Sequence, residues 1–337
     1  MRGLRYLALT CALSLVAAPA FAGKPPSPAP DSAAKARNKA QLAFQRDLVS
    51  VLAPRVDALP LLAAALLARP LVNQTPTNSF HALIGRAAQA EDADAAVSWV
   101  RLADCDAKAD ACPNPAALEQ LQTQAPDNAA VWLLKLAEDT RNMKSDAARV
   151  DLAKAAAAKL YDDYAGTSLK ALAMSVDVLP PPADTFDPAH AAGAGAVGMQ
   201  TMLAYGLTRA QPQPGLQLTA KLCESADGDA SIKADCLKLG KTLEWGSSPL
   251  SRSLGLHLRE VLADDPAQQE DAKRARASLI WQVQSFDRLL ARAPDDKALA
   301  QHLLALARNG GTEMSLLLAA LRDESIPADP PADAKSQ

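Results

Sequence analysis

Three glycines, Gly193, Gly195 and Gly198, match the G-x-G-x-x-G spacing of dinucleotide-binding turns. That chemistry needs a strand before the first glycine and a βαβ unit around it, because the backbone must meet a pyrophosphate at a helix start. A proline-rich stretch and the helix-start pair Asp187-Pro188 precede the motif instead. We therefore expect no cofactor, and interpret the glycines as a place where two helices approach closely or one helix is loosened.

A second candidate is a short acidic segment with Asp104, Asp106 and Asp110, since alternating carboxylates can hold Ca²⁺. The EF-hand pattern fails there, because Lys108 stands at the fifth position and Ala109 replaces the turn glycine. The sequence favours a solvated loop between helices, and a weak Ca²⁺-binding or small-molecule-binding module remains an alternative.

The histidines indicate no catalytic centre. They are scattered one per region along the chain, at His81, His190, His257 and His302. The sequence contains no H-E-x-x-H, C-x-x-C-H or G-x-S-x-G motif, the patterns of zinc proteases, haem attachment and serine hydrolases. We predict no catalytic or metal-binding residues. A cell-envelope enzyme, whose acid and base a single sequence does not reveal, remains the runner-up.

The first residues have the pattern of a secretory signal peptide. Arg2 and Arg5 precede an apolar run over residues 7–16, and Ala20-Phe21-Ala22 is the small-x-small triplet that a signal peptidase cleaves. The apolar run is shorter than the roughly 20 residues that a membrane span needs. We expect a signal peptide over residues 1–22, cut after Ala22, and a mature protein that is periplasmic or secreted.

Charge and hydropathy narrow the class of partner. The chain carries 35 basic and 38 acidic side chains, and loss of Arg2 and Arg5 moves the net charge from −3 to −5. Nucleic acids and anionic membranes both need clustered positive charge, so neither is expected as a partner. The longest remaining apolar run, residues 59–68, is bounded by Asp57 and Arg69 and favours a buried helix. We expect no membrane insertion after signal cleavage.

Cysteine usage agrees with export. Cys11 lies in the signal, and the other four form two local pairs, Cys105 with Cys112 and Cys223 with Cys236. A continuous helix would separate the members by ~10 Å and ~20 Å, beyond the ~7 Å limit between bridged Cα atoms. Four cysteines allow three pairings. We favour the local one, with the chain turning back inside each pair, over a zinc site, which needs closer spacing and a nearby histidine.

Helix signals run through the rest of the chain, and strand signals are absent. Aromatic residues make up only 4% of the sequence, and capping residues stand before prolines at Asn114-Pro115, Ser248-Pro249 and Asp265-Pro266. Further candidate N-caps are Asp127, Ser145, Thr167, Asp187, Asp229, Asp295 and Thr312, and candidate stops are Gly166, Gly228, Gly246 and Gly310-Gly311. We predict an all-α protein of about fourteen or fifteen helices.

Proline-rich segments divide this helical chain. We expect a linker over residues 23–31, an N-terminal helical half over 32–179, a break over 180–187, a C-terminal helical half over 188–325 and a disordered tail over 326–337. Each half contains one cysteine pair. Both two domains and one continuous superhelix are consistent with this division.

Two segments resemble a repeat family. Ala125-Pro126-Asp127-Asn128-Ala129 before residues 132–137 is similar to a tetratricopeptide (TPR) or Sel1-like unit, and Ala293-Pro294-Asp295-Asp296-Lys297 before residues 303–307 is similar to it. The steady repeat length of those families is missing. The resemblance implies antiparallel helix hairpins stacked as an α-solenoid, stapled by local disulfides, and a role in protein interaction. Our leading hypothesis is a non-catalytic exported scaffold that binds another envelope protein.

Overall fold

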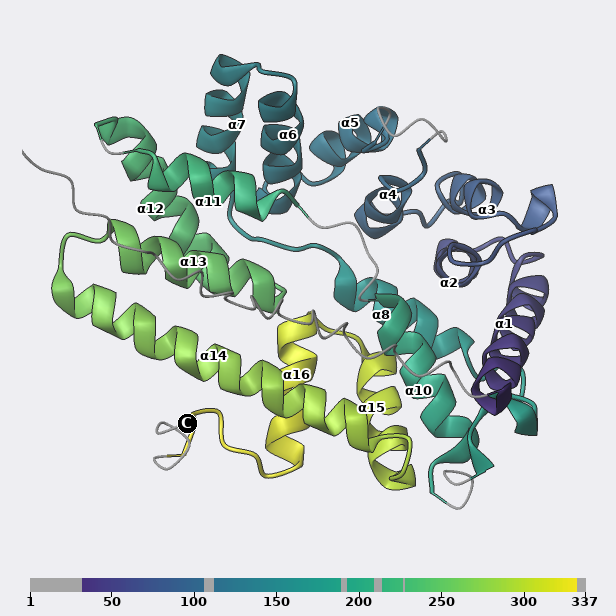
Figure 1. Ribbon diagram of the computed structural model, residues 1–337. Helices are drawn as coiled ribbons and strands as arrows, with labels where there is room; N and C mark the ends of the chain where they lie inside the picture. The colour runs from purple at the N-terminus through teal and green to yellow at the C-terminus, as the bar shows by residue number, and fades with distance from the viewer. Residues whose placement is uncertain (1–31, 106–111, 189–192, 209–213, 227, 332–337) are drawn as a thin grey trace, which may run out of the picture.

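The computed structural model describes residues 32–105, 112–188, 193–208, 214–226 and 228–331. The predicted signal peptide (residues 1–22) and the predicted linker (residues 23–31) lie outside these residues. Within them the regular elements are helices, and the one β-type contact is an isolated bridge between Asn128 and Leu160. The described chain is therefore all-α, as the capping pattern and the shortage of strand-forming residues predict (Figure 1).

The helices of the first part of the chain are α1 (Ser32–Leu52), α2 (Ala58–Ala68), the 3-10 helix η1 (Pro76–Asn78), α3 (Phe80–Ala87), α4 (Ala95–Arg101), α5 (Pro115–Gln124), α6 (Ala129–Arg141), α7 (Ser145–Ala157) and α8 (Ala165–Ser175). The remaining helices are the 3-10 helix η3 (Ala183–Thr185), α10 (Gly195–Thr208), α11 (Leu216–Glu224), α12 (Ala230–Glu244), α13 (Pro249–Leu262), α14 (Pro266–Arg292), α15 (Lys297–Asn309) and α16 (Glu313–Asp323).

Side-chain caps begin many of these helices where the sequence predicts. Asn114 accepts a hydrogen bond from the Ala117 amide, Asp265 from the Ala267 amide and Thr312 from the Ser315 amide. Two caps lie one residue later than expected, at Asn128 and Asp296. In both cases neighbouring residues have capping side chains, and the backbone geometry decides between them.

Helix α8 differs from the prediction. Gly166 is expected to stop a helix and Thr167 to start the next one, yet α8 already begins at Ala165 and contains both. The capping position belongs to Tyr164, which has a left-handed φ of 55°. Gly166 lies against the backbone of Gly311, and a Cβ at this position would overlap the Gly311 carbonyl oxygen. The glycine is therefore present for close packing rather than for a turn.

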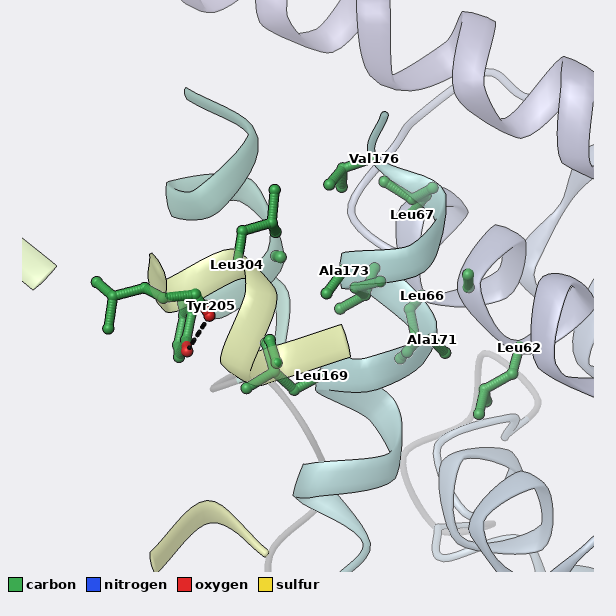
Figure 2. Close-up of a cluster of buried hydrophobic side chains, with 14 of the residues drawn as sticks. Leu62, Leu66, Leu67, Leu169, Ala171, Ala173, Val176, Tyr205 and Leu304 are labelled. Carbon is green, nitrogen blue, oxygen red and sulfur yellow. Dashed lines mark hydrogen bonds between the residues drawn. The ribbon is translucent and has the colours of Figure 1, made fainter. Parts of the chain in front are cut away.

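One hydrophobic core surrounds α2. This helix is apolar on all sides, and its residues from Leu61 to Ala68 are at most 2% exposed. It contacts α1, α3 and α8. Figure 2 shows Leu66 and Leu67 of α2 beside Ala173 of α8, with Leu304 of α15 nearby. At this core the Tyr205 hydroxyl of α10 donates a hydrogen bond to the Leu303 carbonyl oxygen (3.1 Å; Figure 2).

A second core lies between α4–α7 and α11–α13. It contains the fully buried Trp99 and Leu133 together with Cys223, Cys236 and Leu258. Both cores therefore combine side chains from before and after the proline-rich break at 180–187. Hydrophobic packing therefore does not divide at this break.

Helices far apart in sequence lie side by side. Helix α8 contacts α2, α10 and α15, and α7 contacts α12 (Figure 1). Neighbours in sequence also pack, with α6 against α7 and α12 against α13. The molecule thus combines local helix hairpins with long-range contacts between them.

The sequence predicts a disordered tail from residue 326, but the described part of that tail, up to 331, follows α14. Trp281 donates a hydrogen bond from Nε1 to the Pro327 carbonyl oxygen, and Gln282 donates one from Nε2 to the Ala328 carbonyl oxygen, both at 3.0 Å. Polar composition alone did not reveal these contacts, because they depend on donors located 46 residues earlier in the chain.

Candidate functional site

The four predicted cysteines come together as the two local pairs. The Cα atoms of Cys105 and Cys112 are 5.3 Å apart and those of Cys223 and Cys236 are 5.7 Å apart, within the range of disulfides. Gly228, with φ of 125°, lies between α11 and α12 and allows the chain to turn back. The second pair is fully buried in the second core. The two pairs are disulfides that each close a short local loop of the chain.

The G-x-G-x-x-G segment is a packing contact. Gly198 of α10 lies against the turn between α14 and α15, where an added Cβ would be 3.0 Å from the Pro294 Cα. The Ala194 amide donates a hydrogen bond to the Pro294 carbonyl oxygen at 3.3 Å. The interpretation of the glycines as a place of close approach agrees with this geometry.

The histidines do not gather. The three described ones each pair with a carboxylate: His81 Nδ1 with Asp104 (2.9 Å), His257 Nε2 with Glu224 (2.6 Å) and His302 Nε2 with Asp323 (3.1 Å). His190 and the acidic residues Asp106 and Asp110 lie outside the described residues. Among the described residues, no group of three or more histidine, cysteine or acidic side chains could hold a metal ion.

A buried carboxyl pair, which the sequence did not reveal, joins α6 to α7. Asp139 and Asp151 are 3% and 5% exposed. Burial raises the pKa of Asp151 to about 6, and the negative charge of Asp139 adds to this rise. Burial also acts to raise the pKa of Asp139, but the hydrogen bond and charge of Lys135, whose Nζ is 2.8 Å from Asp139 Oδ2, outweigh it and lower that pKa.

Two carboxyls with divergent pKa values are the arrangement that acid–base enzymes use. Here burial and the charge of Asp139 favour the protonated form of Asp151, whereas Lys135 favours the ionised form of Asp139. Neither side chain lines the cavity between α1, η3 and α10. The pair therefore stabilises the α6–α7 hairpin in one protonation state, and it has no access to a substrate from that cavity.

A cavity of about 520 Å³ lies between α1, η3 and α10. Its lining is mainly apolar and includes two methionines from α10. The lining residues are Arg37, Asn38, Gln41, Leu42, Gln45, Phe186, Asp187, Gly195, Gly198, Met199, Met202, Leu203 and Pro294. We refer to it as the α1–α10 cavity.

Polar contacts fix the walls of the α1–α10 cavity. Arg37 forms an ion pair with Asp187 at 3.0 Å, which ties α1 to the segment after η3. Gln41 donates to the Thr185 carbonyl oxygen at 2.7 Å, and Gln45 donates from inside α1 to the Leu67 carbonyl oxygen at 2.6 Å. The single carboxylate of the lining, Asp187, is ion-paired, so the cavity contains no acid–base pair.

No local sequence pattern predicts this cavity, because its walls come from segments that are far apart in the chain. Met199 and Leu203 have the i, i+4 spacing of one helix face, but that spacing is equally typical of a core. Only the folded arrangement shows that α1, which starts at Ser32, covers α10 incompletely.

The chain matches no protein family model, no curated protein and no solved structure. The resemblance to TPR and Sel1-like units therefore depends on residues 125–137 and 293–307 alone. In the part of the chain that the structure describes, no helix combines the length and the apolar character needed to cross a membrane.

Proposed function

We propose that this protein is an exported, non-catalytic helical scaffold, and that the α1–α10 cavity binds an apolar segment of another envelope protein. The observation that carries the proposal is the lining of the cavity. Its apolar members are Leu42, Phe186, Met199, Met202, Leu203 and Pro294. Met202 is 40% exposed, and unbranched methionine side chains adapt to ligands of different shape.

The size and chemistry of the cavity favour binding over catalysis. Its volume of about 520 Å³ lies within the roughly 300–1,000 Å³ of typical ligand sites, enough for one or two large side chains of a partner. The carboxyl pair with divergent pKa values lies elsewhere, between α6 and α7. An enzyme would need such groups at the cavity wall.

Two further features support the exported scaffold. The N-terminal pattern is that of a signal peptide, and the two local cysteine pairs fit an oxidising compartment. The TPR-like and Sel1-like segments imply an α-solenoid of stacked hairpins, an architecture used for protein recognition. Hairpins such as α6–α7 and α12–α13 are consistent with that proposal.

Site-specific photo-crosslinking tests the proposal. A photoreactive p-benzoylphenylalanine replaces Met202 at the cavity, and in a matched control it replaces Met143, an 88% exposed methionine of the α6–α7 turn. In a periplasmic extract we expect a defined adduct from position 202 that is absent from position 143. The additional substitution Leu42→Asp puts a carboxylate among the apolar walls and should abolish the adduct. Identical products from both positions, or no adduct from position 202, would contradict the proposal.

A further inference from the structure

A proline-rich segment of this chain is already seated on a helix face. The tail after α16 turns at Ser325, and Pro327, Ala328 and Asp329 then lie along α14. Asp329 accepts a hydrogen bond from the Ser278 hydroxyl at 2.7 Å through Oδ1. Together with the bonds from Trp281 and Gln282, three donors of α14 hold three consecutive tail residues.

The donors form one surface. Ser278, Trp281 and Gln282 are spaced i, i+3 and i+4 and so share one face of α14. We call this surface the α14 tail face. The Arg288 guanidinium lies over the Trp281 ring, 4.9 Å from its centroid, which leaves the indole N–H edge directed at the tail.

The chemistry of these contacts suits a proline-rich ligand. Two of the three acceptors are backbone carbonyls, which proline-rich segments leave free because such segments form few internal hydrogen bonds. Aromatic side chains beside hydrogen-bond donors are a recurrent means of recognising such segments. The third acceptor, the Asp329 carboxylate, adds a preference for an acidic residue.

The tail is held loosely enough to exchange. Residues 327–329 are exposed, and only Ile326 packs against the first core. A cavity of about 380 Å³ remains between the tail and Leu318, Leu321 and Arg322 of α16, so the apolar packing there is incomplete. A segment with few buried contacts and exposed hydrogen bonds opens at low cost in free energy.

The same tripeptide recurs in the chain. Pro-Ala-Asp occurs at 182–184, at 327–329 and at 331–333, so the tail itself contains two copies. We propose that the α14 tail face is a binding site for proline-rich Pro-Ala-Asp segments, which the chain's own tail fills in cis and a proline-rich segment of a partner protein fills in trans. This site is separate from the α1–α10 cavity.

Competition between tail and partner determines the design of the experiment. A tethered segment has an effective concentration in the millimolar range, so a free peptide must compete with it. We use the full chain with Pro327→Gly and Asp329→Ala, which loosens the tail and removes its bond to Ser278 but keeps Ile326 in place. The probe is a synthetic peptide with the sequence of residues 326–333, labelled at its carboxyl end, and fluorescence anisotropy measures its binding.

We expect the tail-loosened chain to bind the peptide at least about ten-fold more tightly than the wild-type chain does. Trp281→Phe in the loosened chain keeps the ring and removes the N–H donor, and should weaken binding roughly five-fold. Trp245→Phe is the matched control at an 82% exposed indole outside α14, and should leave binding unchanged. Circular dichroism verifies that every variant is folded.

Three outcomes would overturn the proposal. The peptide could bind the wild-type and the loosened chain equally, a scrambled peptide could bind as well as the native one, or Trp281→Phe could have no effect. In the first case the peptide would bind without competing with the tail, in the second it would bind without a preference for the sequence, and in the third it would bind without the Trp281 donor. The α1–α10 cavity shares none of these residues, so its crosslinking result stands independently.

Discussion

At the scale of single residues, a negative charge on the buried Asp151 lowers the stability of the fold. Asp151 is buried next to Asp139, and Lys135 compensates mainly one of the two carboxyls. Lys144 Nζ lies 3.8 Å from Asp139 Oδ1, again on the side of Asp139. A second negative charge at Asp151 would therefore be poorly compensated between α6 and α7.

This arrangement predicts a pH dependence of stability. The pKa of Asp151 is about 6 in the folded chain, against an ordinary value of 3.8. Between the two pKa values the folded chain therefore keeps a proton on Asp151 that the unfolded chain has lost. The stability that this proton provides is complete below the ordinary pKa of 3.8 and is lost as the pH rises through about 6. The Asp151→Asn substitution resembles the protonated form. It should raise the free energy of unfolding by about 1–3 kcal/mol at pH 7.5 and change it little at pH 4.5.

Urea unfolding at the two pH values measures this effect. Asp146→Asn, at an exposed acid of the same helix, is the control, because it has no buried charge to relieve. An Asp151→Asn variant that shifts the urea midpoint equally at both pH values would contradict the prediction. The sequence could not reveal the pair, since Asp139 and Asp151 meet only through the register of the α6–α7 hairpin.

At the scale of elements, capping residues and glycines in the sequence predict most of the helices. A few helices begin or end at other residues than predicted, because tertiary packing decides their bounds. Asn114, Asp265 and Thr312 cap helices as predicted, because a capping side chain acts within its own turn. The sequence predicts a helix end at Gly166, and this prediction is wrong because α8 continues through it. A glycine that stops a helix and one that admits a neighbouring backbone are indistinguishable in sequence.

Two glycine substitutions separate those roles. Gly166→Ala places a methyl group against the Gly311 backbone and should lower the free energy of unfolding by about 1–3 kcal/mol, because α8 must move away from the α15–α16 turn. Gly85→Ala in α3 is the matched control, since an added Cβ there meets nothing within 4 Å, and it should raise stability by up to about 1 kcal/mol. Thermal unfolding followed by circular dichroism compares them. Equal effects of the two substitutions would refute a packing role for Gly166.

At the scale of the whole molecule, composition predicted the all-α class, whereas the assembly of the helices depended on long-range contacts. The sequence divides the chain at residues 180–187, but each core draws on helices from both sides of that segment. The α1–α10 cavity escaped prediction for the same reason. Its walls come from α1, η3 and α10, and no local pattern records which helices meet.

Interleaved cores predict that the two sequence-defined halves do not fold alone. Residues 32–187 and 188–331, produced separately, should each lack a cooperative thermal transition, because α8 loses α10 and α15, and α12 loses α7. Mixing the two fragments should restore part of the helical signal. A cooperative transition in either isolated half, monitored by circular dichroism, would show that the halves are independent domains.

The wholly apolar surface of α2 has a consequence for synthesis of the chain. Helices α1 and α3 are made close in time to α2. Helix α8 follows about a hundred residues later, and its Ala173, together with Val176 just after it, lies beside Leu66 and Leu67 (Figure 2). Until the ribosome has passed that point, a leucine-rich face remains open to other chains. We therefore expect a nascent or truncated product that ends before α8 to be the form that aggregates or that chaperones bind.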